Sequence, residues 1–162
     1  MVSIKDIPVE EQLKIVRKVM SVLPFYVDAA CGEGCDSCVR SFFEDLASDL
    51  DTFATSHNLP RDHAADLVRT LGIISILIFG REFETRYIEG FPGEAVIRLT
   101  ECPMLHRADE RGFAHSRASV LCSAYVQSII KALNPRYQIR TSRAMCRGDN
   151  FCEMIIEPKK DT

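Results

Sequence analysis

The chain has 162 residues, of which 46% are apolar and 27% are charged, a balance typical of a folded globular protein and unlike that of a disordered chain. Its net charge of −3 argues against non-specific binding to nucleic acid, which depends on clustered lysine and arginine. The longest apolar run, 72–79, is far shorter than the ~20 residues of a membrane span, and the N-terminus lacks a signal-peptide pattern. We therefore expect a cytoplasmic protein with no membrane or nucleic-acid partner, whose thiols stay reduced.

The first 80 residues are expected to be mostly helical. Apolar residues at helical spacing, together with start and stop signals, predict three helices over 8–24, 37–56 and 58–79. The first should end near Pro24, so that a loop over 25–36 carries most of a cysteine-rich segment at 31–38. The apolar stretch 73–79 equally suits a buried strand, because periodicity alone does not separate the two.

From residue 81 the pattern changes to that of strands. Segments 82–89 and 95–101 predict a hairpin around Gly90-Phe-Pro-Gly93, and segments 136–145 and 151–157 predict a second one. A helix is predicted between the hairpins, over 115–133. The expected fold class is α+β: a single domain over 1–162 in which helices pack on one face of a roughly four-stranded antiparallel sheet. Region 81–158, with two hairpins flanking a helix, would carry a cysteine metal site.

Seven cysteines fall into two groups, and an odd number excludes a complete set of intrachain disulfides. The C-terminal group consists of Cys102, Cys122, Cys146 and Cys152. The last two flank a tight turn, so their sulfurs can converge on one ion, and tetrahedral zinc takes four such ligands. We therefore predict a structural zinc site on these four cysteines. The alternative is that Cys102 and Cys122 are buried core cysteines without a ligand.

Several short motifs occur between Leu99 and Glu157: Cys102-Pro103, Cys122 on a helix, Leu133-Asn134-Pro135, and Gly148-Asp149-x-x-Cys152-Glu153. With these motifs the stretch resembles the C-terminal part of the L-2-amino-thiazoline-4-carboxylic acid hydrolase-like family. It is also similar to the vinyl-reductase-type (4-vinyl reductase) domain, a small-molecule-binding module that also serves phenol-responsive bacterial activators as their sensing domain.

Those sensors carry zinc on three cysteines and a glutamate, so the resemblance implies zinc on Cys122, Cys146 and Cys152. Arg143 stands where the glutamate would fall, and Cys102 is the substitute that we expect as the fourth ligand. The resemblance also implies a pocket for a small apolar or aromatic ligand or cofactor between the helices and the sheet. The residues expected to line it are Ile74, Ile78, Phe83 and Tyr125.

The N-terminal group, Cys31, Cys35 and Cys38, has the Cys-x3-Cys-x2-Cys spacing of the cluster loop in radical S-adenosylmethionine enzymes. Three thiolates can hold three irons of a [4Fe–4S] cluster. A radical enzyme is not expected, because its barrel needs ~200 residues or more. The alternatives are a second zinc with Glu33, Asp36 or a histidine as fourth ligand, a redox-active or reactive thiol, and no role at all.

The leading hypothesis is a cytoplasmic, non-catalytic module, a sensor or a carrier, with zinc on the C-terminal cysteines and a small ligand above it. A second hypothesis is a hydrolase that opens a thiazoline-type ring through a cysteine or a metal-bound water, with Glu101 as a candidate general base. A third is an iron–sulfur protein that uses the N-terminal cysteines for redox chemistry or cluster delivery. A homodimer or another partner protein is compatible with each.

Overall fold

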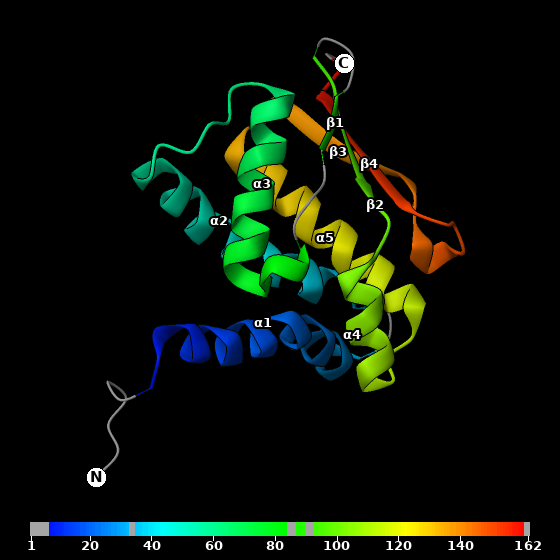
Figure 1. The fold of residues 1–162 in the computed structure, drawn as a ribbon. Helices are drawn as coiled ribbons and strands as arrows, with labels where there is room; N and C mark the ends of the chain where they lie inside the picture. Colours follow the sequence, from blue (N-terminus) through cyan, green and yellow to red (C-terminus); the bar gives the residue numbers. More distant parts are fainter. Residues whose placement is uncertain (1–6, 33–34, 84–86, 90–92, 161–162) are drawn as a thin grey trace.

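The computed structural model describes residues 7–32, 35–83, 87–89 and 93–160 (Figure 1). The helices are α1 (Val9–Cys31), α2 (Asp36–Ser56), α3 (Ala64–Phe79), α4 (Pro103–Arg111) and α5 (His115–Leu133), with short 3-10 turns η2 (Arg81–Phe83) and η3 (Met145–Arg147). The strands are β1 (Tyr87–Glu89), β2 (Ala95–Leu99), β3 (Tyr137–Arg143) and β4 (Cys152–Pro158). The predicted α+β class is confirmed. No helix in the described part of the chain is long and apolar enough to cross a membrane.

The strands form one antiparallel sheet in the order β1-β2-β4-β3. Buried and more exposed residues alternate along β4, where Cys152, Met154 and Ile156 are buried, and along β2, where Ala95 and Ile97 are buried. Side chains of alternate residues point to opposite faces of a sheet, so one face is apolar and covered. The other face carries charged pairs such as Arg98–Glu153, joined at 2.8 Å.

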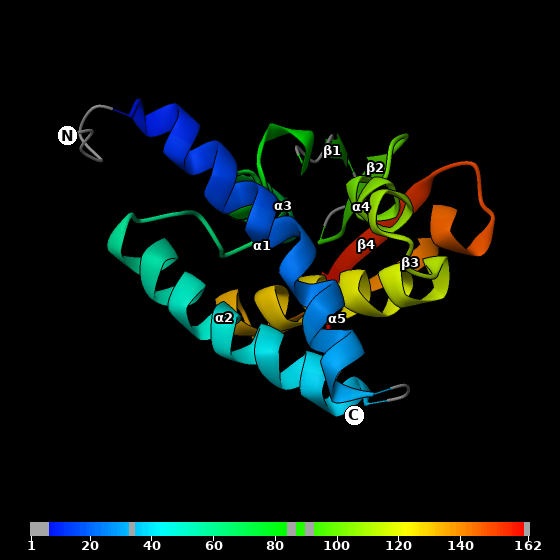
Figure 2. The same cartoon turned by 90° about the horizontal axis from the view of Figure 1, so that it is seen from below.

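Helix α5 connects the two halves of the molecule, because it contacts both β3 and α2. In Figure 2 α2 runs beside α5, and α1 crosses the molecule next to both helices. Leu121, Ile129 and Ile130 of α5 are fully buried, and the same core includes Leu71 and Ile74 of α3. The predicted helices 37–56 and 115–133 are confirmed as α2 and α5, since their apolar stripes extend over several turns.

The prediction that the first helix ends near Pro24 is wrong, because α1 continues through this proline to Cys31. A proline inside a helix removes one hydrogen bond and costs about 3 kcal/mol. Burial of Phe25 and Val22 on either side of it opposes this cost, since each buried apolar side chain contributes about 1.5–3 kcal/mol. Most of the expected loop over 25–36 is therefore helix. Of the connection between α1 and α2, the structure describes Gly32 and Cys35.

Two further features of the helices differ from the predictions. Helix α3 begins at Ala64 rather than near 58, and its start is marked by a capping box between His63 and Asp66. It runs to Phe79 as predicted, so the alternative of a strand over 73–79 is wrong. Helix α4 was not predicted, because nine residues with few apolar positions give little periodic signal. Pro103 in its first turn was the sequence signal for the start of this helix, because proline is favoured at the first helical position. The predicted turn at 90–93 lies mostly outside the described residues.

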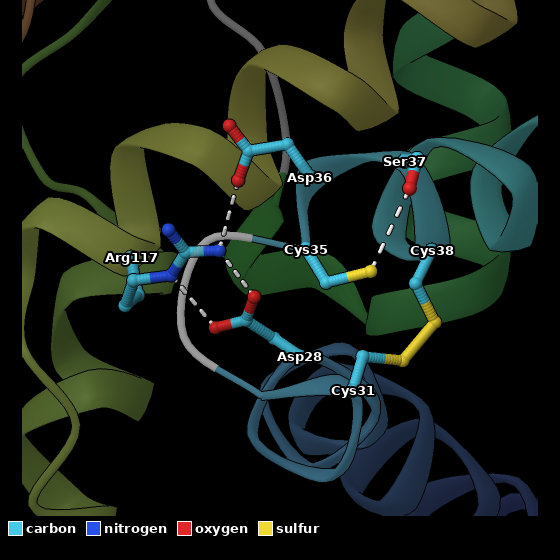
Figure 3. Close-up of a disulfide and its surroundings, with 7 residues drawn as sticks. All are labelled: Asp28, Cys31, Cys35, Asp36, Ser37, Cys38 and Arg117. Carbon is cyan, nitrogen blue, oxygen red and sulfur yellow. Dashed lines mark hydrogen bonds and ion pairs between the residues drawn. A yellow bond between two sulfur atoms is a disulfide. The ribbon is translucent and has the colours of Figure 1, made fainter.

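An ion-pair cluster joins α1, α2 and α5 where the first two helices meet (Figure 3). Arg117 of α5 donates through Nε to Asp28 Oδ2 at 2.8 Å and through its Nη2 to the other oxygen of Asp28. The same Nη2 donates to Asp36 Oδ1 at 3.2 Å. The side chain of Asp28 is only 10% exposed. A carboxylate buried this far needs its cation, so the cluster holds the end of α1 against α5.

We expect Arg117→Met to lower the free energy of unfolding by about 3 kcal/mol, because it leaves the Asp28 carboxylate buried without its partner. This is the lower end of the usual range for such pairs, since the Arg117 side chain is itself 27% exposed. The matched control is Lys131→Met on the same helix, where the exposed pair with Glu44 contributes less than about 1 kcal/mol. Urea unfolding of both variants measures the difference. Equal losses in the two would contradict this role of Arg117.

Candidate functional site

A cavity of about 300 Å³ lies between α3, α5 and the covered face of the sheet. Its buried walls are apolar and include Leu71, Phe79, Ala118, Val126 and Met154. The lining also contains three charged residues, all solvent-exposed: Arg81, Arg98 and Glu101. Hydroxyl side chains such as Ser119 and Ser123 complete the lining. A cavity of this size with apolar walls and placed polar groups is typical of a small-molecule site.

A hydroxyl pair provides a polar point in the apolar wall. Ser75 Oγ of α3 and Tyr125 Oη of α5 are joined at 3.0 Å, and both residues are buried. The Tyr125 ring is held edge-on by Phe79, with ring centres 5.1 Å apart, and is also in contact with Phe43. Burial raises the pKa of Tyr125, so its hydroxyl stays protonated and can donate a hydrogen bond.

The four C-terminal cysteines all line this cavity, although they come from four different elements. Cys102 precedes α4 as its N-terminal cap residue and Cys122 lies on α5, while Cys146 is in η3 and Cys152 begins β4. None of them is in a disulfide. The structure therefore places thiols that are up to fifty residues apart in the sequence around one cavity.

Cys102 and Cys152 are neighbours in the cavity wall, and their mutual interaction raises the pKa of Cys102 and lowers that of Cys152. The backbone N–H of Met145 donates to Cys152 Sγ at 3.3 Å, and the positive charge of Arg147 favours the thiolate further. Burial, followed by the neighbouring Cys152 and Cys146, raises the pKa of Cys122 to about 12. These effects favour the thiolate form at Cys152 more than at Cys102 or Cys122.

Zinc on the four cysteines stays a prediction. Within the described ranges, no three histidine, cysteine or acidic side chains are grouped closely enough to hold an ion. The donors nevertheless have suitable chemistry, because free thiols share one cavity and one of them favours the thiolate form. The hydrolase hypothesis also stays a prediction: Glu101 lines the cavity but is exposed, and His106 is exposed on α4.

Two of the four residues predicted for the ligand pocket line the cavity, Phe83 and Tyr125. Ile74 is instead fully buried in the core and Ile78 packs against it, and neither is among the described residues of the cavity wall. Their neighbour Ser75 lines the cavity together with Leu71 and Phe79, which lie one turn before and one turn after it on α3. A serine inside the apolar run 72–79 was the sequence signal for this residue, and it was missed.

The N-terminal cysteines form a separate group, away from the cavity. Cys31 and Cys38 are joined by a disulfide, and Cys35 between them is a free thiol (Figure 3). A [4Fe–4S] cluster needs all three as thiolates, so the cluster prediction applies only to the reduced chain, where it stays a prediction. The pairing agrees with the alternative of a redox-active thiol group.

The fold and cavity together define an α+β protein with an apolar interior site. Comparison with known proteins finds a solved structure with a similar fold. No protein-family model and no curated protein sequence matches the chain. Among solved structures, it is similar to trafficking protein particle complex subunit 3 from Naegleria fowleri, crystallised covalently bound to palmitic acid. The TM-score is 0.57 at 12% identity, over 91% of this chain and 97% of that chain. A likeness at this identity shows a shared fold.

These findings correct the resemblance to the thiazoline hydrolase-like and vinyl-reductase-type families, which is wrong. No family model supports it, and the similar fold is that of a trafficking complex subunit. The motifs that suggested it are structural signals with little family specificity. Asn134 caps the end of α5, and Gly148 adopts a left-handed φ of 95° in the turn after η3. Helix ends and turns in unrelated proteins use the same residues.

We expect Tyr125→Phe and Ser75→Ala each to lower the free energy of unfolding by about 1–3 kcal/mol, because each leaves the other hydroxyl buried without its partner. The double variant removes both hydroxyls, so its loss should be clearly smaller than the sum of the two. Thermal or urea unfolding of the three variants gives the coupling between them. Strictly additive losses would show that the two hydroxyls do not interact.

Proposed function

We propose that the chain is a small-molecule-binding protein whose cavity takes an apolar or aromatic molecule. The observation that carries this proposal is the cavity itself, about 300 Å³ walled by buried apolar side chains. Such a cavity excludes water from the apolar part of a ligand, which favours binding by the hydrophobic effect. The Tyr125–Ser75 pair gives one polar group of the ligand a hydrogen-bond partner.

The structural neighbour supports a ligand of this polarity. The trafficking subunit with the similar fold carries palmitic acid, an apolar chain with one polar end. A fold that accommodates an acyl chain in one protein can present an apolar interior in another. We treat a small aromatic molecule with one hydroxyl group as the first candidate, because the cavity wall includes the rings of Phe79, Phe83 and Tyr125.

We further propose that the four cysteines on one side of the cavity bind zinc. The support is their convergence on one cavity and the thiolate character of Cys152. The ion would require the four sulfurs to draw closer together than they lie in the described structure. A site of four thiolates is closed, so the zinc would tie α5 to η3 and β4 without performing chemistry.

A protein partner is the third part of the proposal. The large apolar residues that the described chain exposes all lie on α1 with the adjoining Ile7 or on α3, among them Val9, Val16 and Val19, which share the outer face of α1. An exposed apolar stripe of this kind is typical of an interaction surface. The trafficking neighbour is itself a subunit of a complex. Light scattering measures the molar mass of the purified chain. A doubled mass would indicate a homodimer, and a single mass would leave another protein as the partner.

We expect 1-naphthol to bind the wild-type protein and Thr141→Trp to weaken this binding at least tenfold, about 1.4 kcal/mol. Thr141 lines the cavity from β3, so a tryptophan there fills part of its volume. Gln138→Trp is the matched control, because Gln138 lies exposed on the opposite face of the same strand. Fluorescence titration measures the affinity, and palmitate added as a competitor tests for an acyl chain. Equal affinities in both variants would contradict the cavity as the site.

Elemental analysis of protein purified anaerobically should give one zinc per chain, and Cys122→Ser should lose most of it because a neutral hydroxyl is a poor substitute for a thiolate. Cys35→Ser is the control, since Cys35 belongs to the other group of cysteines. Protein without zinc, or zinc that remains in Cys122→Ser, would remove this part of the proposal and leave the ligand cavity untouched.

A further inference from the structure

The connection between α1 and α2 combines a disulfide with a third cysteine. Cys31 is the last residue of α1 and Cys38 the third residue of α2, and their Cα atoms lie 6.5 Å apart across the bond that joins them. Cys35 lies between them in the sequence and keeps a free thiol. In Figure 3 the Cys35 side chain points toward the side on which Cys31 and Cys38 are joined.

The surroundings of Cys35 favour its thiolate. Cys35 is the residue at the N-terminal cap of α2, a helix of 21 residues, where the helix dipole stabilises a negative charge. Ser37 Oγ lies 3.6 Å from the sulfur, and the hydrogen bonds from Ser37 and the Cys38 backbone N–H lower the pKa of Cys35. Asp28 of α1 and Asp36 of α2 act in the opposite direction. Both carboxylates are paired with Arg117 of α5, which reduces their effect.

Cys35 and Cys38 are three residues apart in the same helical turn, which is the spacing of a disulfide within one turn. The Cys38 N–H donates to the Cys35 carbonyl at 3.1 Å, so the two residues lie within one turn at the start of α2. A Cys-x-x-Cys pair at a helix N-terminus is the arrangement in which thiols exchange readily. Two disulfides are therefore available to Cys38, one with Cys31 and one with Cys35.

We propose that Cys31, Cys35 and Cys38 form a thiol–disulfide exchange site that moves one disulfide between two pairings. The Cys35 thiolate attacks the Cys38 sulfur, the Cys31–Cys38 bond breaks as the Cys35–Cys38 bond forms, and Cys31 leaves as a thiolate that takes a proton from water. No electrons are gained or lost in this step. A thiol reductant such as glutathione then reduces either disulfide with two electrons and two protons.

The two pairings differ in what they hold together. The Cys31–Cys38 disulfide joins the end of α1 to α2, whereas a Cys35–Cys38 disulfide lies within the start of α2 and leaves the last turn of α1 free of it. The Asp28–Arg117 ion pair, one turn before Cys31, still holds α1 to α5 in both states. The exchange therefore releases the end of α1 locally. Disulfides in a reducing compartment, which the sequence predicts for this chain, are usually transient in this way.

The test is peptide mapping of the full-length protein after incubation in mixtures of reduced and oxidised glutathione. Cleavage after Glu33 separates Cys31 from Cys35, and cleavage before Asp36 separates Cys35 from Cys38, so the pairings give different peptides. Wild-type protein should show both the Cys31–Cys38 and the Cys35–Cys38 disulfides, whereas Cys35→Ser should show the first alone. A single Cys31–Cys38 disulfide in the wild type, with Cys35 free throughout, would overturn the proposal.

A second measurement uses Ser37→Ala, with Ser41→Ala on an exposed position of the same helix as the control. Loss of the Ser37 hydroxyl should raise the pKa of Cys35, so its alkylation by iodoacetamide should slow at neutral pH and recover at high pH. The second pairing should form more slowly in the same variant. Unchanged pH profiles in Ser37→Ala would overturn the activation of Cys35.

Discussion

Burial of α5 between the sheet and α2 is the packing on which the rest of the structure depends. Leu121, Ile129 and Ile130 are fully buried, and each contributes about 1.5–3 kcal/mol by leaving water. The same helix carries Arg117 near its start, which pairs with α1 and α2, and Tyr125 in its middle, which pairs with Ser75 of α3. One helix therefore connects every layer of the fold through both apolar and polar contacts.

The position of α5 also explains the site. Because its apolar face lies against the sheet, Cys122 lines the same cavity as Cys152, the first residue of β4, and Cys102, the cap residue of α4. The cavity remains beside them, between the rings of Phe79 and Tyr125 and the side chain of Met154. The thiols and the hydroxyl pair are thus polar groups set in an apolar wall, and burial is the main cause of the raised pKa values of Cys122 and Tyr125. A molecule bound in the cavity would therefore contact apolar side chains, thiols and the Tyr125–Ser75 hydroxyl pair.

Much of the fold could be predicted from the sequence, because long amphipathic patterns dominate it. Both α2 and α5 carry apolar stripes over several turns, and their limits were predicted to within a residue. The extent of α1 was not predictable from local signals, since Pro24 normally ends a helix and only tertiary burial of Phe25 offsets its cost. The cysteine groupings were readable from spacing. Their pairing was not, because the Cys31–Cys38 disulfide depends on how α1 meets α2.

The account rests on four distant thiols meeting at one cavity, and cross-linking tests this most directly. Dibromobimane joins two neighbouring thiols and fluoresces when both of its arms have reacted. In a variant with serine at 31, 35 and 38, only Cys102, Cys122, Cys146 and Cys152 remain. We predict a fluorescent product in which Cys122 of α5 is linked to Cys146 or Cys152. Products on single cysteines alone, with no link between α5 and the C-terminal hairpin, would contradict the account.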